Sequence, residues 1–137
     1  MTPPADEIHM KIMLPAPPEV VYDMLMDPKR QTEFTGFLAE GSPEIGGRMS
    51  AGNGHITILN LELERGARIV QEWSTRTWPE GVPPSQLEIS MRAIGQGTDL
   101  RMVQTGIPAE MKDDIEQGWF DHYWNPMFEH LHKKALY

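Results

Sequence analysis

The chain contains no cysteine, which excludes disulfide bonds and any chemistry that needs a thiolate. It has no apolar run near the roughly 18 residues needed to cross a bilayer. Its first residues also lack the charged start and apolar stretch of a signal peptide. We therefore expect a cytoplasmic protein without membrane insertion.

Basic residues are scarce. The 12 lysines and arginines are outnumbered by 20 aspartates and glutamates, which gives a formal net charge of −8. Binding to nucleic acid needs a basic face that neutralises phosphates. We therefore expect no nucleic-acid partner, and solubility is the simplest reason for the negative charge.

Motifs for metal, phosphate or nucleophilic chemistry are missing as well. The chain has five histidines but no H-E-x-x-H pattern. On a helix His130 and His132 point in different directions, and His122 and His130 lie about 12 Å apart along the axis. No serine sits in a glycine elbow, and no glycine-rich loop opens a helix. We expect no metal, no cofactor and no serine-based catalytic site.

The length of 137 residues is that of one domain, and a chain of this size buries about two thirds of its unfolded surface. Hydrophobic residues make up 39% of the chain, and 12 glycines come in addition. This is a globular composition. We expect a single domain over residues 1–137, present as a monomer or homodimer.

The first part of the chain predicts one strand and two short helices. Residues 8–14 alternate in the period of a strand with one buried face. Pro15, Pro17 and Pro18 end this strand. An apolar stripe predicts a helix over residues 18–26, and Asp27 is placed to cap a second helix over residues 29–34.

Residues 48–105 carry the pattern of antiparallel strands at hairpin spacing. Glycine-rich turns separate the segments, and the Gly-Asn-Gly sequence at 52–54 is a strong hairpin signal. In the segment after this turn, Leu59, Leu61 and Leu63 share one face. We expect strands over residues 48–51, 55–63, 68–75, 86–93 and 98–105.

Residues 109–136 predict a long helix that the rest of the chain surrounds. Apolar residues recur there every four positions, as in an amphipathic helix. Pro126 removes one backbone hydrogen bond and is expected to bend the helix, and Gly118 is expected to let another backbone approach. The apolar stripe consists of Ile115, Trp119, Tyr123, Met127 and Leu131.

An antiparallel sheet with one apolar face needs a cover, and only the C-terminal helix is long enough to lie across it. We therefore predict an α+β fold in which a curved antiparallel sheet wraps around this helix. The two short helices after the first strand close one end. A cavity remains between helix and sheet if the sheet curls strongly.

Several short motifs follow one another over nearly the whole chain. They are residues 16–28 (APPEVVYDMLMDP), 45–49 (IGGRM), 61–64 (LELE) leading to 68–73 (RIVQEW), 97–100 (GTDL), 104–108 (QTGIP) and 118–126 (GWFDHYWNP). In this order they resemble the START-like, Bet v 1-like or SRPBCC superfamily with its helix-grip fold. Within it the chain closely resembles the AHSA1 branch, named for the C-terminal domain of the activator of Hsp90 ATPase. The resemblance implies this fold and a hydrophobic cavity.

The resemblance does not imply one activity. Many relatives are small-molecule binders, some superfamily members are cyclases or other enzymes, and the namesake is a co-chaperone. The namesake has a separate N-terminal domain that binds Hsp90, and 137 residues leave no room for it, which argues against ATPase activation. The chain departs from the family pattern at residues 31–36, where a tryptophan pair is common, and at residues 50–52, where an aromatic residue is frequent. Both sites are expected near the cavity mouth.

The candidate ligand contacts are aromatic rings, thioethers and amides on the inward faces of the expected elements. Rigid rings with flexible thioethers suit a pocket for apolar ligands, and an ordinary packed core would use the same residue types. Two amides are unusual in a core unless they are paired, so they would anchor a ligand, bond each other or bond water. The candidates are Trp73, Trp78, Met91, Met102, Gln71, Gln104, Trp119, His122, Tyr123 and Met127.

Three functions follow as hypotheses. The first is the non-enzymatic binding of a small hydrophobic molecule in the cavity. The second, implied by the resemblance alone, is a co-chaperone or stress-related interaction module with a chaperone as partner. The third is a cyclase- or hydrolase-like enzyme in which His122 acts as general acid or base. The plainer alternative for His122 is a solvated side chain beside Asp121.

Overall fold

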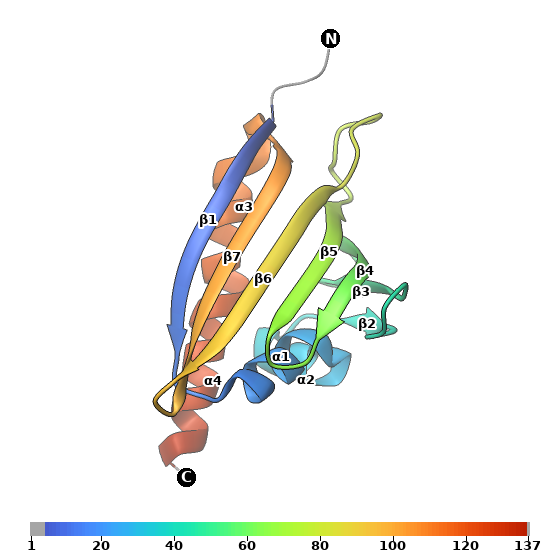
Figure 1. The fold of residues 1–137 in the computed structure, drawn as a ribbon. Coiled ribbons are helices and arrows are strands. Elements are labelled where there is room, and N and C mark those ends of the chain that lie inside the picture. Colours follow the sequence, from blue (N-terminus) through green and yellow to red (C-terminus); the bar gives the residue numbers. More distant parts are fainter. Residues whose placement is uncertain (1–4, 137) are drawn as a thin grey trace.

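The computed structural model describes residues 5–136, so residues 1–4 and 137 at the ends of the expected domain lie outside it. Seven antiparallel strands form one sheet in the order β1-β7-β6-β5-β4-β3-β2 (Figure 1). The strands are β1 (Ala5–Leu14), β2 (Glu40–Gly41), β3 (Arg48–Ala51), β4 (Ile56–Glu64), β5 (Arg68–Thr75), β6 (Ser85–Ile94) and β7 (Gly97–Pro108).

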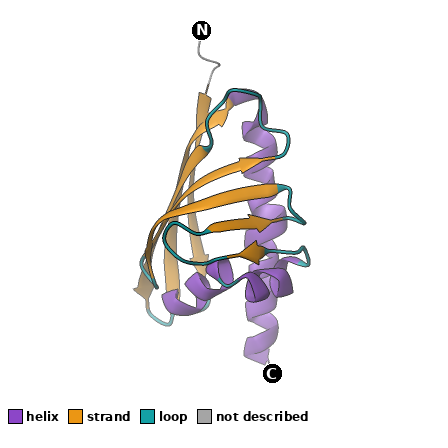
Figure 2. Ribbon diagram, turned by 90° about the vertical axis from the view of Figure 1, so that its right-hand side faces the viewer, coloured by secondary structure: helices purple, strands orange, loops and turns teal. Residues whose placement is uncertain are grey.

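Two short helices, α1 (Pro18–Met26) and α2 (Pro28–Thr35), follow β1, and a long helical segment ends the chain. This segment begins with the 3₁₀ turn η1 (Ala109–Met111), continues as α3 (Lys112–Trp119), widens into the π-turn η2 (Phe120–Trp124) and ends as α4 (Asn125–Leu136). Figure 2 shows the curved sheet on one side of this helix, with α1 and α2 near its C-terminal end. The predicted fold is confirmed.

One strand was not predicted, and several strand ends differ from the prediction by up to three residues. β2 was not predicted, because two exposed residues carry no period. β7 continues to Pro108, three residues beyond its predicted end at 105, because it stays paired with β1 as far as Ala5. The chain therefore passes from the sheet into the C-terminal helix without a loop.

The inward face of β4 is not the one that the alternating leucines indicate. Ile58 and Asn60 are buried, whereas Leu61 is 38% exposed, and the pairing register shifts after Asn60. The Asn60 amide donates hydrogen bonds to the carbonyl oxygens of Ser42 (3.1 Å) and Glu44 (3.2 Å). A polar side chain thus takes an inward position because it holds the segment between β2 and β3.

The C-terminal helix departs from α geometry at η2. Pro126 has no N–H, so a carbonyl oxygen in the preceding turn loses its α-helical partner. The N–H of Asn125 donates to the carbonyl oxygen of Phe120, five residues back. Trp119 and Trp124 would lie about 140° apart on an α-helix, yet here their rings stack with centroids 5.6 Å apart. The disturbance expected at Pro126 is therefore a π-turn, and it turns both tryptophans the same way.

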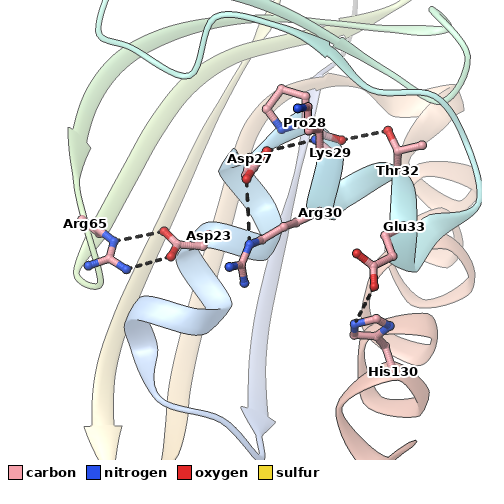
Figure 3. Close-up of polar contacts among 9 residues, drawn as sticks. All are labelled: Asp23, Asp27, Pro28, Lys29, Arg30, Thr32, Glu33, Arg65 and His130. Carbon is pink, nitrogen blue, oxygen red and sulfur yellow. Dashed lines mark hydrogen bonds and ion pairs between the residues drawn. The ribbon is translucent and has the colours of Figure 1, made fainter. Parts of the chain in front are cut away.

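Ionic contacts attach the two short helices to the rest of the fold (Figure 3). Asp23 of α1 accepts hydrogen bonds from Nε (3.0 Å) and Nη2 (2.7 Å) of Arg65 in the turn between β4 and β5. Glu33 of α2 lies 3.7 Å from His130 of α4. Asp27 caps α2 through its side chain, as predicted. The short helices are thereby held between the sheet and α4.

Asp99 on β7 lies between two guanidinium groups and is only 2% exposed. Arg101 donates to it at 3.0 Å and Arg92 at 3.1 Å. The hydrogen bond from Arg101, with a smaller contribution from Arg92, holds the pKa of Asp99 below its ordinary value, although burial acts in the opposite direction. The carboxylate therefore stays ionised where β6 and β7 pair.

We expect Asp99→Asn to lower the free energy of unfolding near neutral pH, because a neutral amide cannot replace the charge between Arg92 and Arg101. The folded-state pKa lies below the unfolded value, so the carboxylate stabilises the fold above about pH 4 and loses this contribution as the pH falls further. Urea unfolding at a series of pH values should show the difference between wild type and variant shrinking in acid. Glu80→Gln, in an exposed loop, is the control. A difference that stays constant into acid would contradict the assignment.

Candidate functional site

A cavity of about 610 Å³ lies between the C-terminal helix and the part of the sheet near β4 and β5. This volume is in the range of small-molecule sites. The lining residues come from the end of α2 and the loop after it, the β3–β4 turn, β4, β5 and the loop after it, and the C-terminal helical segment. They are Thr35, Phe37, Gly52, His55, Ile56, Trp73, Thr75, Thr77, Glu110, Met111, Asp114, Ile115, Gly118, Trp119, His122 and Tyr123.

The cavity lies on this side because the helix is closer to the opposite part of the sheet. α3 contacts β1, and in Figure 1 the helix runs behind β1 and β7. Met91 of β6, Met102 of β7 and Met127 of α4 are buried in the core and line no part of the cavity. Space is left where the helix stands away from β4 and β5.

Aromatic rings form the floor of the cavity. The ring of Trp119 lies 6.1 Å from that of Trp73 and 4.8 Å from that of Tyr123, measured between centroids. All three residues are buried. They also border a second, much smaller space of about 20 Å³ deeper in the core. These rings therefore form the wall between the cavity and the packed interior.

Exposed and mostly polar side chains surround the mouth. They are Phe37, His55, Glu110, Asp114 and His122. The ring of Phe37 meets the imidazole of His122 edge-on, with centroids 5.5 Å apart. Among the described residues that line the cavity there is no lysine or arginine. The mouth thus carries two carboxylates and two imidazoles.

One side of the mouth is braced by Asn53, which has a positive φ of 58° in the β3–β4 turn. Its side-chain oxygen accepts a hydrogen bond from the N–H of Leu38 at 2.7 Å, and its own N–H donates to the carbonyl oxygen of Leu38 at 3.1 Å. This pair of bonds joins the loop that carries Phe37 to the turn that carries Gly52. The two segments on this side therefore keep a fixed spacing.

A chain of buried hydrogen bonds fixes Trp119. Its indole N–H donates to Oε1 of Gln104 at 2.9 Å, and Nε2 of Gln104 donates to Oγ of Ser85 at 3.0 Å. The Ser85 hydroxyl in turn donates to the carbonyl oxygen of Trp73 at 2.6 Å. Both ends of the Gln104 amide are therefore bonded inside the protein, and Gln104 does not line the cavity.

Gln71 also has partners of its own. Its Nε2 donates to Oδ1 of Asn60 at 2.8 Å and lies 3.5 Å from the sulfur of Met26. Gln71 borders the small space and not the cavity. The two glutamines thus do not bond each other.

The structure brings part of the predicted ligand contacts together. Trp73, Trp119, His122 and Tyr123 line the cavity. Trp78 is half-buried outside it, with its ring edge-on to Trp73 at 6.2 Å and its N–H bonded to the carbonyl oxygen of Pro83 at 2.9 Å. The remaining candidates, Gln71, Met91, Met102, Gln104 and Met127, lie in the core.

Gly118 has a different role from the one expected. No other backbone approaches it, and an added Cβ would meet only Cδ2 of His122, at 3.9 Å. Gly118 lines the cavity. The absence of a side chain there leaves room for a ligand beside the helix.

Most of the mouth was not predicted from the sequence. Phe37 follows a short helix and belongs to no periodic pattern. Thr35 and Gly52 do line the cavity, and they come from the two segments where the chain departs from the family pattern. Met111 lies eight residues before Trp119, on the same four-residue spacing, and this signal could have identified it.

Within residues 5–136 no three histidine, aspartate or glutamate side chains lie together as metal ligands. In the same residues no helix is both long enough and apolar enough to span a membrane.

The sequence matches the family model described as "Activator of Hsp90 ATPase homolog 1-like protein" over residues 15–132, which confirms the resemblance. It is 31% identical over 118 residues to the Activator of 90 kDa heat shock protein ATPase homolog of Dictyostelium discoideum. The aligned region covers 85% of this chain and 30% of that protein. The chain spans about a third of the length of the curated relatives that it matches.

Solved structures share the fold. An HSP90 activator from Plasmodium falciparum has a TM-score of 0.80 at 24% identity, with 95% of each chain covered. CalU16 from Micromonospora echinospora has a TM-score of 0.78 at 22% identity, with 93% of this chain and 74% of that chain covered. At these identities the likeness shows the fold alone.

We expect Gln104→Leu to lower the free energy of unfolding by about 1–3 kcal/mol, because the buried N–H of Trp119 loses its acceptor. Urea unfolding measures this change. Gln86→Leu is the matched control, since Gln86 is exposed on β6, and it should change the free energy by less than about 0.5 kcal/mol. Equal effects of the two substitutions would show that the buried chain of hydrogen bonds does not hold Trp119.

Proposed function

The chain belongs to the family of Activator of Hsp90 ATPase homolog 1-like proteins, and we propose that it binds a small hydrophobic molecule in the cavity between the sheet and the C-terminal helix, without catalysing a reaction on it. We also propose that the protein acts in the cytoplasm, since a chain without cysteine has no need of an oxidising compartment.

The cavity of about 610 Å³ with its floor of apolar rings supports this proposal most directly. An aromatic or aliphatic ligand would cover Trp73, Trp119 and Tyr123, and apolar burial contributes about 25 cal/mol per Å². We favour binding over catalysis because His122 is exposed and makes no hydrogen bond to another described side chain. Among the described residues no hydrogen bond orients the imidazole as a general acid or base.

Gly118→Phe should block the cavity while the fold remains intact. An added Cβ would make one ordinary van der Waals contact, with Cδ2 of His122 at 3.9 Å, and glycine is one of the poorest helix formers, so the substitution favours the helix. We expect prodan, a neutral fluorescent naphthalene ketone, to bind the wild type and to lose about ten-fold or more in affinity in this variant. Fluorescence titration measures both affinities.

Gly118→Ala is the control, because a methyl group leaves most of the cavity free and should preserve prodan binding. Thermal unfolding checks that each variant folds, and prodan at about 100 times its dissociation constant should stabilise the wild type by about 2.7 kcal/mol. Equal binding of prodan to wild type and Gly118→Phe would place the dye elsewhere. No binding by the wild type across a panel of neutral aromatic compounds would end the proposal.

A second function, contact with a chaperone, is favoured by the relatives. The matching Dictyostelium protein is named an activator of a 90 kDa heat shock protein ATPase, and the Plasmodium structure is described as an HSP90 activator. We propose an Hsp90-type chaperone of the same host as a protein partner of this chain.

Isothermal titration of this protein into the purified chaperone of its own host tests the partnership, and we expect measurable binding. An ATPase assay on the same mixture shows whether hydrolysis accelerates. Binding that persists in Gly118→Phe would assign the chaperone to a surface outside the cavity. The absence of binding and of any change in ATPase rate would remove the chaperone as a partner.

A further inference from the structure

Two hydrogen-bond donors on the cavity floor have no partner within residues 5–136. They are the hydroxyl of Tyr123 and the indole N–H of Trp73, and as whole residues these are 7% and 5% exposed. Each of the other three tryptophans donates its N–H to a protein acceptor. Among the buried aromatic residues of the described chain, Trp73 and Tyr123 combine an unpaired donor with a place in the cavity lining.

Both donors reach open space. In the described chain no fully enclosed side-chain nitrogen or oxygen lacks a hydrogen bond, so these two groups are not sealed in the packed interior. Both residues line the cavity. A ligand that covers these donors without offering an acceptor would leave them unpaired, at a cost of about 1–3 kcal/mol, and an acceptor atom on the bound molecule avoids this cost.

The charges around the cavity select the kind of acceptor. Burial raises the pKa of the Tyr123 phenol well above its ordinary value, so the hydroxyl keeps its proton and remains a donor. Glu110 and Asp114 lie at the mouth, and no lysine or arginine is among the described lining residues. An anionic ligand would approach two carboxylates without a fixed positive charge to receive it. A neutral acceptor fits better.

The ring of Trp119 offers a fixed surface for a flat ligand. Trp119 is fixed by its bond to Gln104 and contacts the rings of both Trp73 and Tyr123. A flat ligand lying against Trp119 would therefore lie beside both residues that carry the unpaired donors. Stacked or edge-on contact between aromatic rings adds about 0.5–1.5 kcal/mol to area burial.

On the basis of the proposed function, we infer that the ligand is a neutral aromatic carbonyl compound. Its ring system lies against Trp119, and its carbonyl oxygen accepts a hydrogen bond from the Tyr123 hydroxyl or the Trp73 indole N–H.

Three probes of one size and shape test this inference: acetonaphthone, isopropenylnaphthalene and naphthoate, each substituted at the same ring position. The second replaces the carbonyl oxygen by a methylene group, and the third carries a negative charge. We expect wild-type protein to bind acetonaphthone about three- to ten-fold more tightly than either of the others. Isothermal titration measures the three affinities.

Tyr123→Phe and Trp73→Phe each remove one donor. We expect at least one of them to remove the preference for acetonaphthone over isopropenylnaphthalene. The ratio of the two affinities is compared within each variant, because a loss of ring area at Trp73 weakens both probes alike. Tyr22→Phe is the matched control, because Tyr22 is a buried tyrosine on α1 that does not line the cavity. The carbonyl stretching band of bound acetonaphthone should lie at lower wavenumber in wild type than in the variant that lost the donor.

The outcomes separate this inference from the proposed function. If isopropenylnaphthalene and acetonaphthone bind the wild type equally, the inference is overturned and binding in the cavity stands. A carbonyl preference that survives in both Tyr123→Phe and Trp73→Phe would also overturn it. If none of the three probes binds, both the inference and the proposed function fail.

Discussion

The bond between Trp119 and Gln104 decides where the C-terminal helix meets the sheet. Gln104 lies on β7 and is held in turn by Ser85 on β6. The helix is therefore attached to the part of the sheet that β6 and β7 form, and its distance from β4 and β5 is left free. The cavity exists because the same helix cannot be close to both parts of a strongly curved sheet.

The π-turn explains how one helix buries so many rings. Apolar residues every four positions drift by about 40° per step on an α-helix, or about 160° from Ile115 to Leu131. The wider turn η2 takes up part of this drift and brings Trp124 beside Trp119. The spacing predicted a helix correctly. The four-residue spacing exceeds the 3.6 residues of an α-helical turn. Together with Pro126, this difference was a further signal that the helix would widen.

The elements and their order could be predicted from periodicity, and the family from the order of the motifs, because both depend on local spacing. The side chains that form the site could be predicted only in part. The alternation along β6 and β7 correctly placed Met91 and Met102 on the buried face of the sheet. Alternation does not show whether a residue on that face contacts the helix or a cavity. In β4 the alternating leucines indicated the wrong inward face, for another reason. Asn60 points inward there because its amide bonds to carbonyl oxygens of a loop distant in sequence.

Buried polar groups carry the information on function, and the sequence alone cannot assign it. Gln71 and Gln104 were predicted as possible ligand anchors, but the side-chain amide of each donates a hydrogen bond to a residue on another strand. Trp73 and Tyr123 gave no such signal, since a core often contains aromatic rings. Their donors are nevertheless the buried ones on the cavity floor that have no partner within residues 5–136. Which polar group meets a ligand therefore depends on the pairing of every other polar group around it, a property of the whole fold.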